Sequence, residues 1–288
     1  MTTTSTLGPE NRLRDVAITG NRLRAHLAKA CVSASLSASM SQVTEMSFTF
    51  ADDEDLTIFR SGVLQPGQTI RYGRDTPWMT RITQGPELDL KGDTPRVSTR
   101  SSAEKVERLR GATGGHNFGS MSVSSFVRAR CNEISWKHHV EPGLASREII
   151  REEPDGDSDK DHNTWEIFTE LASELGVWCF EYGDTLVFGR PSWVASRSGR
   201  RTLSYRWTKW GDYSDGFDGK LSFKGWAREN QEFSIGVVGT DADSIRPGDT
   251  LSVSGNLGRA TGEWVISSVS FPLTRATATR ITCRRAVL

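Results

Sequence analysis

The sequence has little cysteine and no paired cysteine motif. Four cysteines lie far apart in 288 residues, and none of them forms a Cys-x-x-Cys pair. This spacing argues against a zinc knuckle and against the dense disulfide framework of small secreted domains. We therefore predict four reduced core thiols in a protein that folds in cytoplasm: Cys31, Cys131, Cys179 and Cys283.

Net charge and long apolar runs are also missing. The 36 basic side chains balance 36 acidic ones, so no global field favours nucleic acid or an anionic membrane. No stretch approaches the roughly 18 consecutive apolar residues of a membrane span, so we expect no membrane anchor. The start, MTTTSTLGPENRLRD, is polar and has no secretory h-region. Residues 1–14 are expected to form a flexible arm, mobile in isolation or ordered by a partner.

The first structured part of the chain alternates with the period of a β-strand. In CVSASLSASMSQ, serines occupy one side and apolar residues the other, and MSFTFADDEDL repeats the pattern. Several such runs separated by turns predict a first β-barrel domain over residues 15–95. The apolar side of the first run is expected to consist of Val32, Ala34, Leu36, Ala38 and Met40.

Residues 96–198 change to a helical period and predict an α/β domain. One short helix is expected in SSAEKVERLRG, with Ser101 or Ser102 as its N-cap, and another in SVSSFVRARCNEI. The strongest helix lies in HNTWEIFTELASELGVW, where Asn163 and Glu166 have capping-box spacing and Gly176 stands at the end. A hairpin that turns at residues 183–184 follows, and residues 191–201 are expected to be a linker.

Residues 199–288 return to strand-like runs and predict a second β-barrel domain. This part contains SIRPGDTLSV, residues 244–253, which repeats the phrase VLQPGQTIRY of residues 63–72. A strand with a tryptophan follows each phrase, Trp78 in one case and Trp264 in the other. From the residues alone, a true duplication and two unrelated Pro-Gly turns both remain open. The fold class is mixed β-rich α+β, with two similar β-barrels flanking a central α/β domain.

An acidic stretch is a candidate metal site. Alternating aspartates in DGDSDKDHNTWE, with Glu166 eleven residues after the first, have the spacing of a calcium loop. Lys160 stands where that loop needs glycine, and its charge opposes a cation. A solvated loop before a helix is the favoured interpretation of Asp155, Asp157 and Asp159.

Other candidates for chemistry also have structural explanations. His138 and His139 follow Cys131 closely, which suggests a nucleophile with a base, but a buried thiol on a helix fits Cys131 better. Glu166, Glu170 and Glu174 recur every four residues, as on the solvent face of a helix. We predict no catalytic, cofactor-binding or metal-binding residue and no enzyme activity.

The order of these segments resembles a known family. The succession TEMSFTFADDEDL, VSTRSSAEKVERLRG, SVSSFVRARCNEISWKHHVEPG, NTWEIFTELASELGVWCFEYGDTLVFGRPSW and PGDTLSVSG is similar to the trimeric baseplate hub proteins of phage tails. This late-control D-protein family also occurs in contractile injection systems. The resemblance covers residues 16–288 and is most specific over residues 163–193.

The resemblance implies a structural protein of a virion tail, assembled in the host cytoplasm. In such hubs each subunit contributes two barrel-like tube domains, and three subunits close a ring that joins a sixfold tail tube to a threefold tip. Implied partners are two further copies of the chain, a tail tube or distal tail protein, a tip or spike protein and, as a further candidate, the tape-measure protein. DNA is expected to pass through the lumen without specific binding, and no cofactor is expected.

A second interpretation comes from another class. A cell-wall or carbohydrate-active enzyme of the tail tip, or its binding module, would use tryptophans to stack on sugar rings. Trp165 has the spacing of a core residue. Contact with sugars and contact with neighbouring subunits both remain open for Trp207, Trp210, Trp226 and Trp264.

Overall fold

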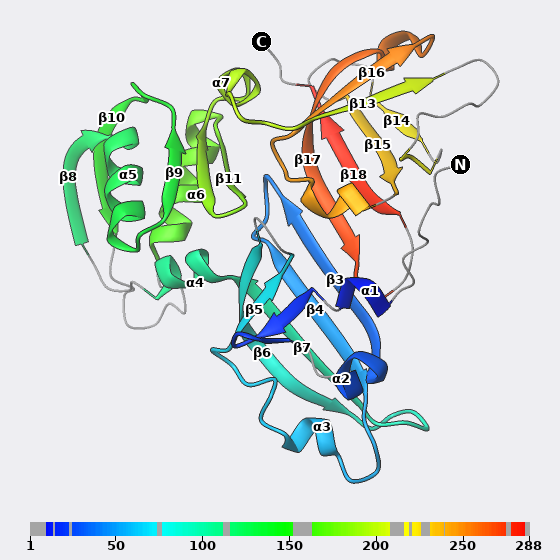
Figure 1. The fold of residues 1–288 in the computed structure, drawn as a ribbon. Helices are drawn as coiled ribbons and strands as arrows, with labels where there is room; N and C mark the ends of the chain where they lie inside the picture. Colours follow the sequence, from blue (N-terminus) through cyan, green and yellow to red (C-terminus); the bar gives the residue numbers. More distant parts are fainter. Residues whose placement is uncertain are drawn as a thin grey trace.

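The computed structural model describes residues 10–13, 15–22, 25–73, 77–111, 116–151, 163–207, 216–218, 221–225, 231–238, 240–274 and 278–285. These residues form three regions, which Figure 1 shows in blue to cyan, in green, and in yellow to red. We name them the first β region (residues 15–103), the central region (residues 104–196) and the second β region (residues 202–285). The β-rich α+β class predicted from the sequence is confirmed.

The first β region is an antiparallel sheet in the order β3-β4-β7-β6-β5-β1-β2. The predicted alternation holds in its first long strand, where Ala34, Leu36 and Ala38 are buried. Its elements are β1 (Val16–Ile18), β2 (Asn21–Arg22), α2 (Ala25–Ala30), β3 (Cys31–Ser39), β4 (Glu45–Ala51), α3 (Thr57–Arg60), β5 (Thr69–Tyr72), β6 (Trp78–Asp89) and β7 (Arg96–Ala103).

One residue of the predicted apolar face lies on the opposite side. Val32 is 44% exposed, although it was expected to share the buried face with Leu36. The pairing of β3 with β4 shifts register between Cys31 and Ser33, and such a β-bulge inserts an extra residue. Because side chains alternate with period two, the shift turns Val32 to solvent.

The second β region repeats the strand order of the first. Its path β14-β15-β18-β17-β16-β13 matches β3-β4-β7-β6-β5-β1 position by position. A bulge also recurs at one place, after Ile82 in β6 and after Ile266 in β17. One difference is that β13 runs parallel to β16, whereas β1 is antiparallel to β5. The elements are β13 (Thr202–Trp207), β14 (Ser222–Lys224), β15 (Glu232–Val237), η2 (Thr240–Ser244), β16 (Thr250–Gly255), η3 (Gly258–Ala260), β17 (Gly262–Pro272) and β18 (Thr279–Arg284).

The two β regions join in one thirteen-stranded sheet. The second half of β17 pairs with β3 in antiparallel register, from Ser268 opposite Ser39 to Pro272 opposite Ser35. Phe271 then points into the core of the first region, with its ring 6.0 Å from Trp78. A single hydrophobic core therefore spans both β regions.

The central region has a hydrophobic core of its own, and Figure 1 shows it beside the joined sheet. Strand β12 pairs antiparallel with β11 and parallel with β9, while β8 and β10 form a separate pair. The elements are α4 (Glu104–Arg110), β8 (His116–Ser122), α5 (Val123–Glu133), β9 (Lys137–Val140), β10 (Ser146–Arg151), α6 (Thr164–Leu175), β11 (Trp178–Tyr182), β12 (Thr185–Gly189) and α7 (Pro191–Ser196).

The predicted capping box of α6 is confirmed. The Asn163 side chain accepts from Glu166 N–H, and the Glu166 carboxylate accepts from Asn163 N–H. Gly176 ends the helix at φ 61°, a conformation that favours glycine. The predicted hairpin is also present, since Tyr182 pairs with Thr185 across a two-residue turn.

Two local expectations in this region are wrong. Ser101 and Ser102 do not cap a helix but belong to β7, where the Ser101 hydroxyl lies 2.8 Å from that of Thr80. Sheet pairing on both sides therefore overrides the capping preference of serine. Residues 191–201 are not a plain linker, since Pro191 begins α7 and Val194 is fully buried.

The end of the predicted N-terminal arm lies against the second β region. Residues Glu10–Leu13 form the helical turn α1, and Leu13 is buried. The Arg12 side chain donates to the Pro272 carbonyl over 2.7 Å and lies 3.5 Å from the Asp243 carboxylate. This segment therefore bridges the start of the chain and the end of β17.

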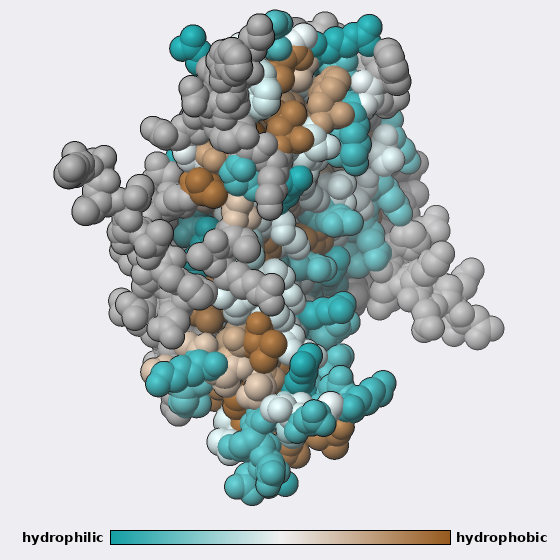
Figure 2. Space-filling view, turned by 90° about the vertical axis from the view of Figure 1, so that its right-hand side faces the viewer, coloured by the Kyte–Doolittle hydropathy of each residue, from teal (hydrophilic) through white to brown (hydrophobic). Residues whose placement is uncertain are grey.

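Among the described residues, none of the helices has the length and apolar character that a membrane crossing requires. Figure 2 shows the face on the side of β14, where apolar residues reach the surface at the level of both β regions between hydrophilic ones.

We predict that the β17–β3 joint depends on buried side chains rather than on strand propensity. Leu36→Ala removes a fully buried side chain opposite Phe271 and should lower the free energy of unfolding by about 2–5 kcal/mol. Val32→Ala, on the exposed face of the same strand, should cost less than about 1 kcal/mol. Equilibrium urea unfolding of the two variants tests this, and equal losses would contradict the assignment of the core.

Candidate functional site

The two Pro-Gly turns have equivalent structures. Gly67 N–H donates to Ile82 O over 2.8 Å, and Gly248 N–H donates to Ile266 O over the same distance. Each isoleucine N–H returns a bond of 2.8 Å to the residue after the glycine. The glycines have φ 89° and 97°, values that a side chain rarely tolerates. The repeated phrase therefore encodes one repeated turn at the start of β5 and of β16.

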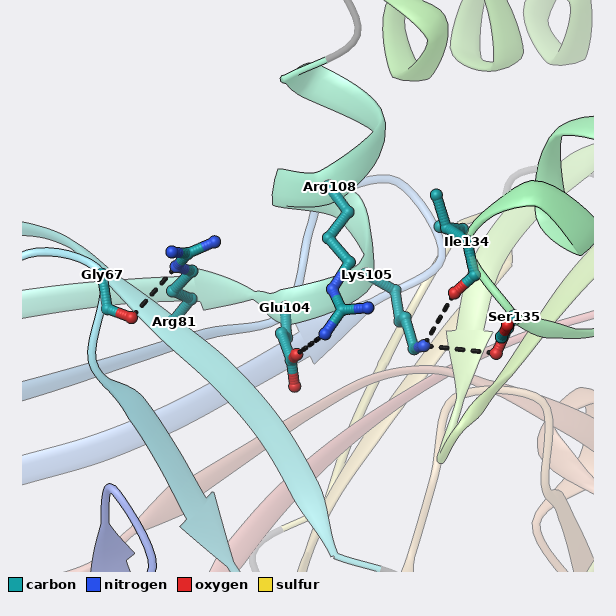
Figure 3. Close-up of polar contacts among 7 residues, drawn as sticks. All are labelled: Gly67, Arg81, Glu104, Lys105, Arg108, Ile134 and Ser135. Carbon is teal, nitrogen blue, oxygen red and sulfur yellow. Dashed lines mark hydrogen bonds and ion pairs between the residues drawn. The ribbon is translucent and has the colours of Figure 1, made fainter.

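The surroundings of the two turns differ. Pro247 and Gly248 are buried under the central region, and a Cβ on Gly248 would lie 2.9 Å from the Phe180 ring. Pro66 and Gly67 are exposed. In the first turn the Arg81 side chain donates to Gly67 O over 3.0 Å, as Figure 3 shows. The chain thus carries one covered turn and one open turn.

The two tryptophans near these turns are not equivalent. Trp78 lies opposite Tyr72, whereas Trp264 lies opposite Leu251. Trp264 is 1% exposed and its indole N–H donates to Ala260 O over 2.8 Å. It is therefore a core residue, and neither contact that the sequence left open for it, with sugars or with neighbouring subunits, is possible. Trp207 is half-buried against the same core, while Trp210 and Trp226 lie outside the described residues.

A buried polar group, which we call the junction cluster, connects the three regions at the covered turn. It consists of Trp78, Tyr182, Arg246 and Asp249. Asp249 has no exposed surface, and its carboxylate accepts from Tyr182 OH over 2.8 Å and from Arg246 N–H over 2.8 Å. It also accepts from Arg201 N–H over 3.0 Å. A buried carboxylate with three donors acts as a rigid structural joint.

Arg246 links the second β region to the first. Its guanidinium lies 3.9 Å from the centre of the Trp78 ring, which is cation–π geometry. It also donates to Asp243 O over 2.9 Å and to Ile245 O over 3.0 Å. Burial lowers the pKa of Arg246 to about 10, so the side chain remains cationic at neutral pH. Burial raises the pKa of Asp249, and its hydrogen bonds from Arg246 and Tyr182 oppose that rise.

Glu181 is a titratable group at the contact between the central region and the first β region. It lies on β11, next to Tyr182 of the junction cluster. Burial raises its pKa to about 7, while hydrogen bonds from Thr44 in the β3–β4 turn oppose the rise. The carboxyl therefore changes charge near neutral pH.

Helix α4 forms the second connection between these regions. It continues directly from β7, and the Lys105 ammonium donates to the carbonyl oxygens of Ile134 and Ser135 over 3.0 and 3.2 Å. Figure 3 shows this contact beside the ion pair of Arg108 with Glu104, whose atoms are 2.6 Å apart. Short polar contacts thus fix the helix to the end of α5.

The face of the sheet opposite the core is polar and hollowed. An open pocket lies over β3, β4, β6 and β7, and hydroxyl side chains dominate its wall. Across β3 and β4 the Ser35 and Ser47 hydroxyls are 2.9 Å apart. The lining also carries charges of both signs, namely Glu45, Glu87 and Arg100. The hydroxyl groups of this wall can hydrogen-bond water, and the lining residues do not define the shape of a particular ligand.

Cys131 and the two histidines that follow it all lie within the described residues. Cys131 is buried, and burial raises the pKa of its thiol to about 12. His138 Nδ1 lies 3.3 Å from Trp136 O. Burial lowers the pKa of His139. Three of the four free thiols are buried, and Cys31 is half-buried.

The acidic candidates lie on α6 or outside the described residues. Glu166, Glu170 and Glu174 are exposed along α6, as their spacing indicated. Asp155, Asp157, Asp159 and Lys160 lie outside the described residues. Within the described part of the chain, no group of three His, Cys, Asp or Glu side chains is arranged to hold a metal ion.

The junction cluster was not predicted from the sequence. One signal was present, because Asp249 follows the second Pro-Gly turn where Gln68 follows the first. An acidic residue at only one of two equivalent turns indicates a contact made by one copy alone. Its donors, Tyr182 and Arg201, are distant in sequence, so only tertiary structure identifies them.

Comparison with known proteins identifies the fold as that of phage tail proteins. No family model matches the sequence, and no curated protein matches it. A tail protein from Neisseria meningitidis superposes with a TM-score of 0.64 at 12% identity, covering 94% of this chain and 96% of that one. The 43 kDa tail protein of prophage MuSo2 from Shewanella oneidensis gives 0.61 at 11%, with the same coverage.

A third similar structure comes from a secretion system. It is an Escherichia coli component of the type VI secretion system, described as structurally similar to the T4 bacteriophage tail proteins gp27 and gp5. It gives a TM-score of 0.60 at 12% identity, over 93% of this chain and 76% of that one. At these identities the comparisons establish a shared fold, which confirms the resemblance seen in the sequence.

The covered turn should tolerate substitution less well than the open turn. Gly248→Ala adds a methyl group against the Phe180 ring at a positive φ, so it should cost about 3–5 kcal/mol of unfolding free energy. Gly67→Ala meets only the flexible end of Arg81, at 3.5 Å, and should cost about 1–2 kcal/mol. The urea midpoints of the two proteins measure the difference. A Gly67→Ala loss as large as that of Gly248→Ala would contradict the described contact.

The Glu181 carboxyl should make stability depend on pH. Its folded pKa of about 7 exceeds the unfolded value of 4.5, so the folded state binds more protons between these values. Stability should be highest below pH 4.5 for this group and should fall as pH rises through 7. Glu181→Gln should remove that fall and raise the unfolding free energy at pH 8 by about 1–2 kcal/mol, after allowance for partial exposure. Thermal unfolding of both proteins at pH 5 and 8 tests the sign; a variant that is less stable at pH 8 would refute it.

Proposed function

We propose that this protein is the hub of a phage tail or of a related injection particle. Three copies form a ring that joins a sixfold tail tube to a threefold tip or spike. The role is structural and assembling, and the chain needs no cofactor. Its place is the tail of the virion, assembled in the host cytoplasm.

The observation that carries this proposal is the repeated strand order within one sheet. Two equivalent units, β3 to β1 and β14 to β13 along the sheet, are joined side by side through β17 and β3. The shared fold with phage tail proteins, over 94% of the chain, supports a place in such a particle.

A duplicated unit solves a symmetry problem. Identical subunits close a ring through repeated head-to-tail contacts, and three copies of a chain with two units present six similar surfaces. A sixfold tube can therefore meet a ring that has only three chains. In this ring residues 15–95 and 199–288 serve as two barrel-like tube domains that flank residues 96–198 along the chain.

The central region gives threefold symmetry to the side of the ring that faces away from the sixfold tube. It covers the Pro-Gly turn at Gly248 and leaves the equivalent turn at Gly67 open. The six units therefore divide into two classes of three wherever the central region contacts them. The side of the ring that carries the central regions suits a threefold tip protein. The opposite side, formed by the six units alone, suits the tube or a distal tail protein.

The serine-rich face of the sheet is the wall of the central channel. Its hydroxyl groups, such as those of Ser35 and Ser47, hydrogen-bond water and one another. Charges of both signs at Glu45 and Arg100 give no continuous basic track for phosphates. DNA or a tape-measure protein would pass this wall without specific binding.

The alternative of a wall-degrading enzyme or sugar-binding module has less support. Trp165 and Trp264 are buried in hydrophobic cores and cannot stack on sugars. The buried Cys131 thiol, with its raised pKa, does not suit a nucleophile at neutral pH.

The proposal predicts a ring of three chains. Light scattering on the purified protein should give about three times the chain mass of 31.9 kDa, and a larger mass when a tail tube protein binds. Negative-stain averages should show threefold symmetry with six lobes. A single-chain mass under all conditions, including excess tube protein, would refute the hub function, and lysis in a peptidoglycan zymogram would favour the enzyme.

A further inference from the structure

One edge of strand β17 pairs with β18, and two different strands pair with its other edge. Its first half pairs with β16, up to Val265 opposite Thr250, and from Ser268 the same edge pairs with β3. The second half of β17 therefore adds a strand to the first β region. Phe271 fills the added position, 6.0 Å from Trp78 and 6.4 Å from Tyr72.

Strand β6, the counterpart of β17, has a partner on the corresponding edge for its first half only. Its first half pairs with β5, up to Arg81 opposite Thr69. On its opposite edge, β6 pairs with β7 as far as Asp89. On the edge that pairs with β5, no strand of the described chain pairs with β6 beyond Arg81. The segment Glu87–Asp89 thus presents an open strand edge where β17 has β3.

The ladders define which residues correspond in the two units. Glu87 lies opposite Ser98 of β7, and Ser270 lies opposite Arg280 of β18, which is the matching rung. On this count Glu87, Leu88 and Asp89 correspond to Ser270, Phe271 and Pro272. The extra residue of β6 is absorbed by its second bulge, between Gln84 and Glu87.

Strand β14 is the counterpart of β3, but within the described part of the chain it pairs only with β15, whereas β3 also pairs with β17. Through the pairings of β15 with β18 and of β4 with β7, residues Ser222, Phe223 and Lys224 correspond to Ser35, Leu36 and Ser37. Leu36 is completely buried because β17 covers it, whereas Phe223 is only half-buried. The Lys224 side chain is 73% exposed, with Glu232 of the neighbouring strand 4.0 Å away.

We propose that Glu87–Asp89 of one copy adds a strand to β14 of the next copy, in the register of the internal β17–β3 joint. Glu87 then lies opposite Lys224, Leu88 opposite Phe223, and Asp89 opposite Ser222. This inference rests on the proposed ring and names the contact that closes it. Each copy donates a strand through β6 and receives one at β14.

The side chains that meet in this register are complementary. An exposed carboxylate faces an exposed ammonium, and cross-strand pairs of opposite charge stabilise antiparallel sheets. Leu88 and Phe223, both half-buried at the margin of the hydrophobic core, cover each other. The contact also removes two open strand edges, which otherwise favour indiscriminate pairing. Because donor and acceptor edges differ, the contact is head-to-tail and propagates around a ring.

Charge reversal tests the register. Four full-length proteins are compared: wild type, Glu87→Lys, Lys224→Glu, and the double variant with both changes. Asp93→Lys, at an exposed position of the β6–β7 hairpin outside the proposed contact, is the control for a charge change alone. Sedimentation equilibrium at low salt measures assembly, and circular dichroism with thermal unfolding checks that each variant is folded.

We expect each single reversal to weaken assembly at least tenfold, and we expect the double variant and Asp93→Lys to assemble as wild type does. A wild-type trimer that both single variants preserve would overturn the proposed contact and leave the hub function intact. A trimer weakened by both single reversals and not recovered by the double variant would overturn the register. A wild-type protein that stays a single chain with tube protein would overturn the hub function itself and this contact with it.

Discussion

The pairing of β17 with β3 is the contact on which the rest of the structure depends. It converts two separate sheets into one and places Phe271 of the second β region in the core of the first. Burial of the apolar side chains of β3 fixes this register, because a shift by one residue would turn them to the polar face. The arm residue Arg12 reinforces the end of β17 by binding Pro272 O. This joint fixes how the two β regions are placed relative to each other.

The two units have the same order of paired strands, but the central region packs on only one of the two equivalent Pro-Gly turns. Equivalent glycines begin β5 and β16 with the same hydrogen bonds, yet only Gly248 lies beneath the Phe180 ring. Asp249 accepts from Tyr182 at that turn, so the central region is bound to one unit through a buried polar joint. The two units therefore share one backbone arrangement, and a few differing positions determine which unit binds the central region.

Much of the fold could be predicted from local patterns. The alternation in β3, the capping box of α6 and the hairpin after it are encoded by neighbouring residues. Errors arose where distant contacts override local preference. Val32 is turned outward by a bulge, and Ser101 belongs to a strand because β4 and β6 pair with it. The junction cluster could not be found, because its members come from all three regions of the chain.

The sequence by itself determined the strand and helix periods, the two Pro-Gly turns and the absence of a recognisable catalytic motif, since these depend on residues a few positions apart. Tertiary structure decided that the two turns belong to units with one strand order, that these units share a sheet and a core, and that only one turn is covered. The physical reason is that strand pairing is long-range. The hydrogen bonds of β17 with β3 join residues more than 200 positions apart, and no local pattern specifies that choice of partner.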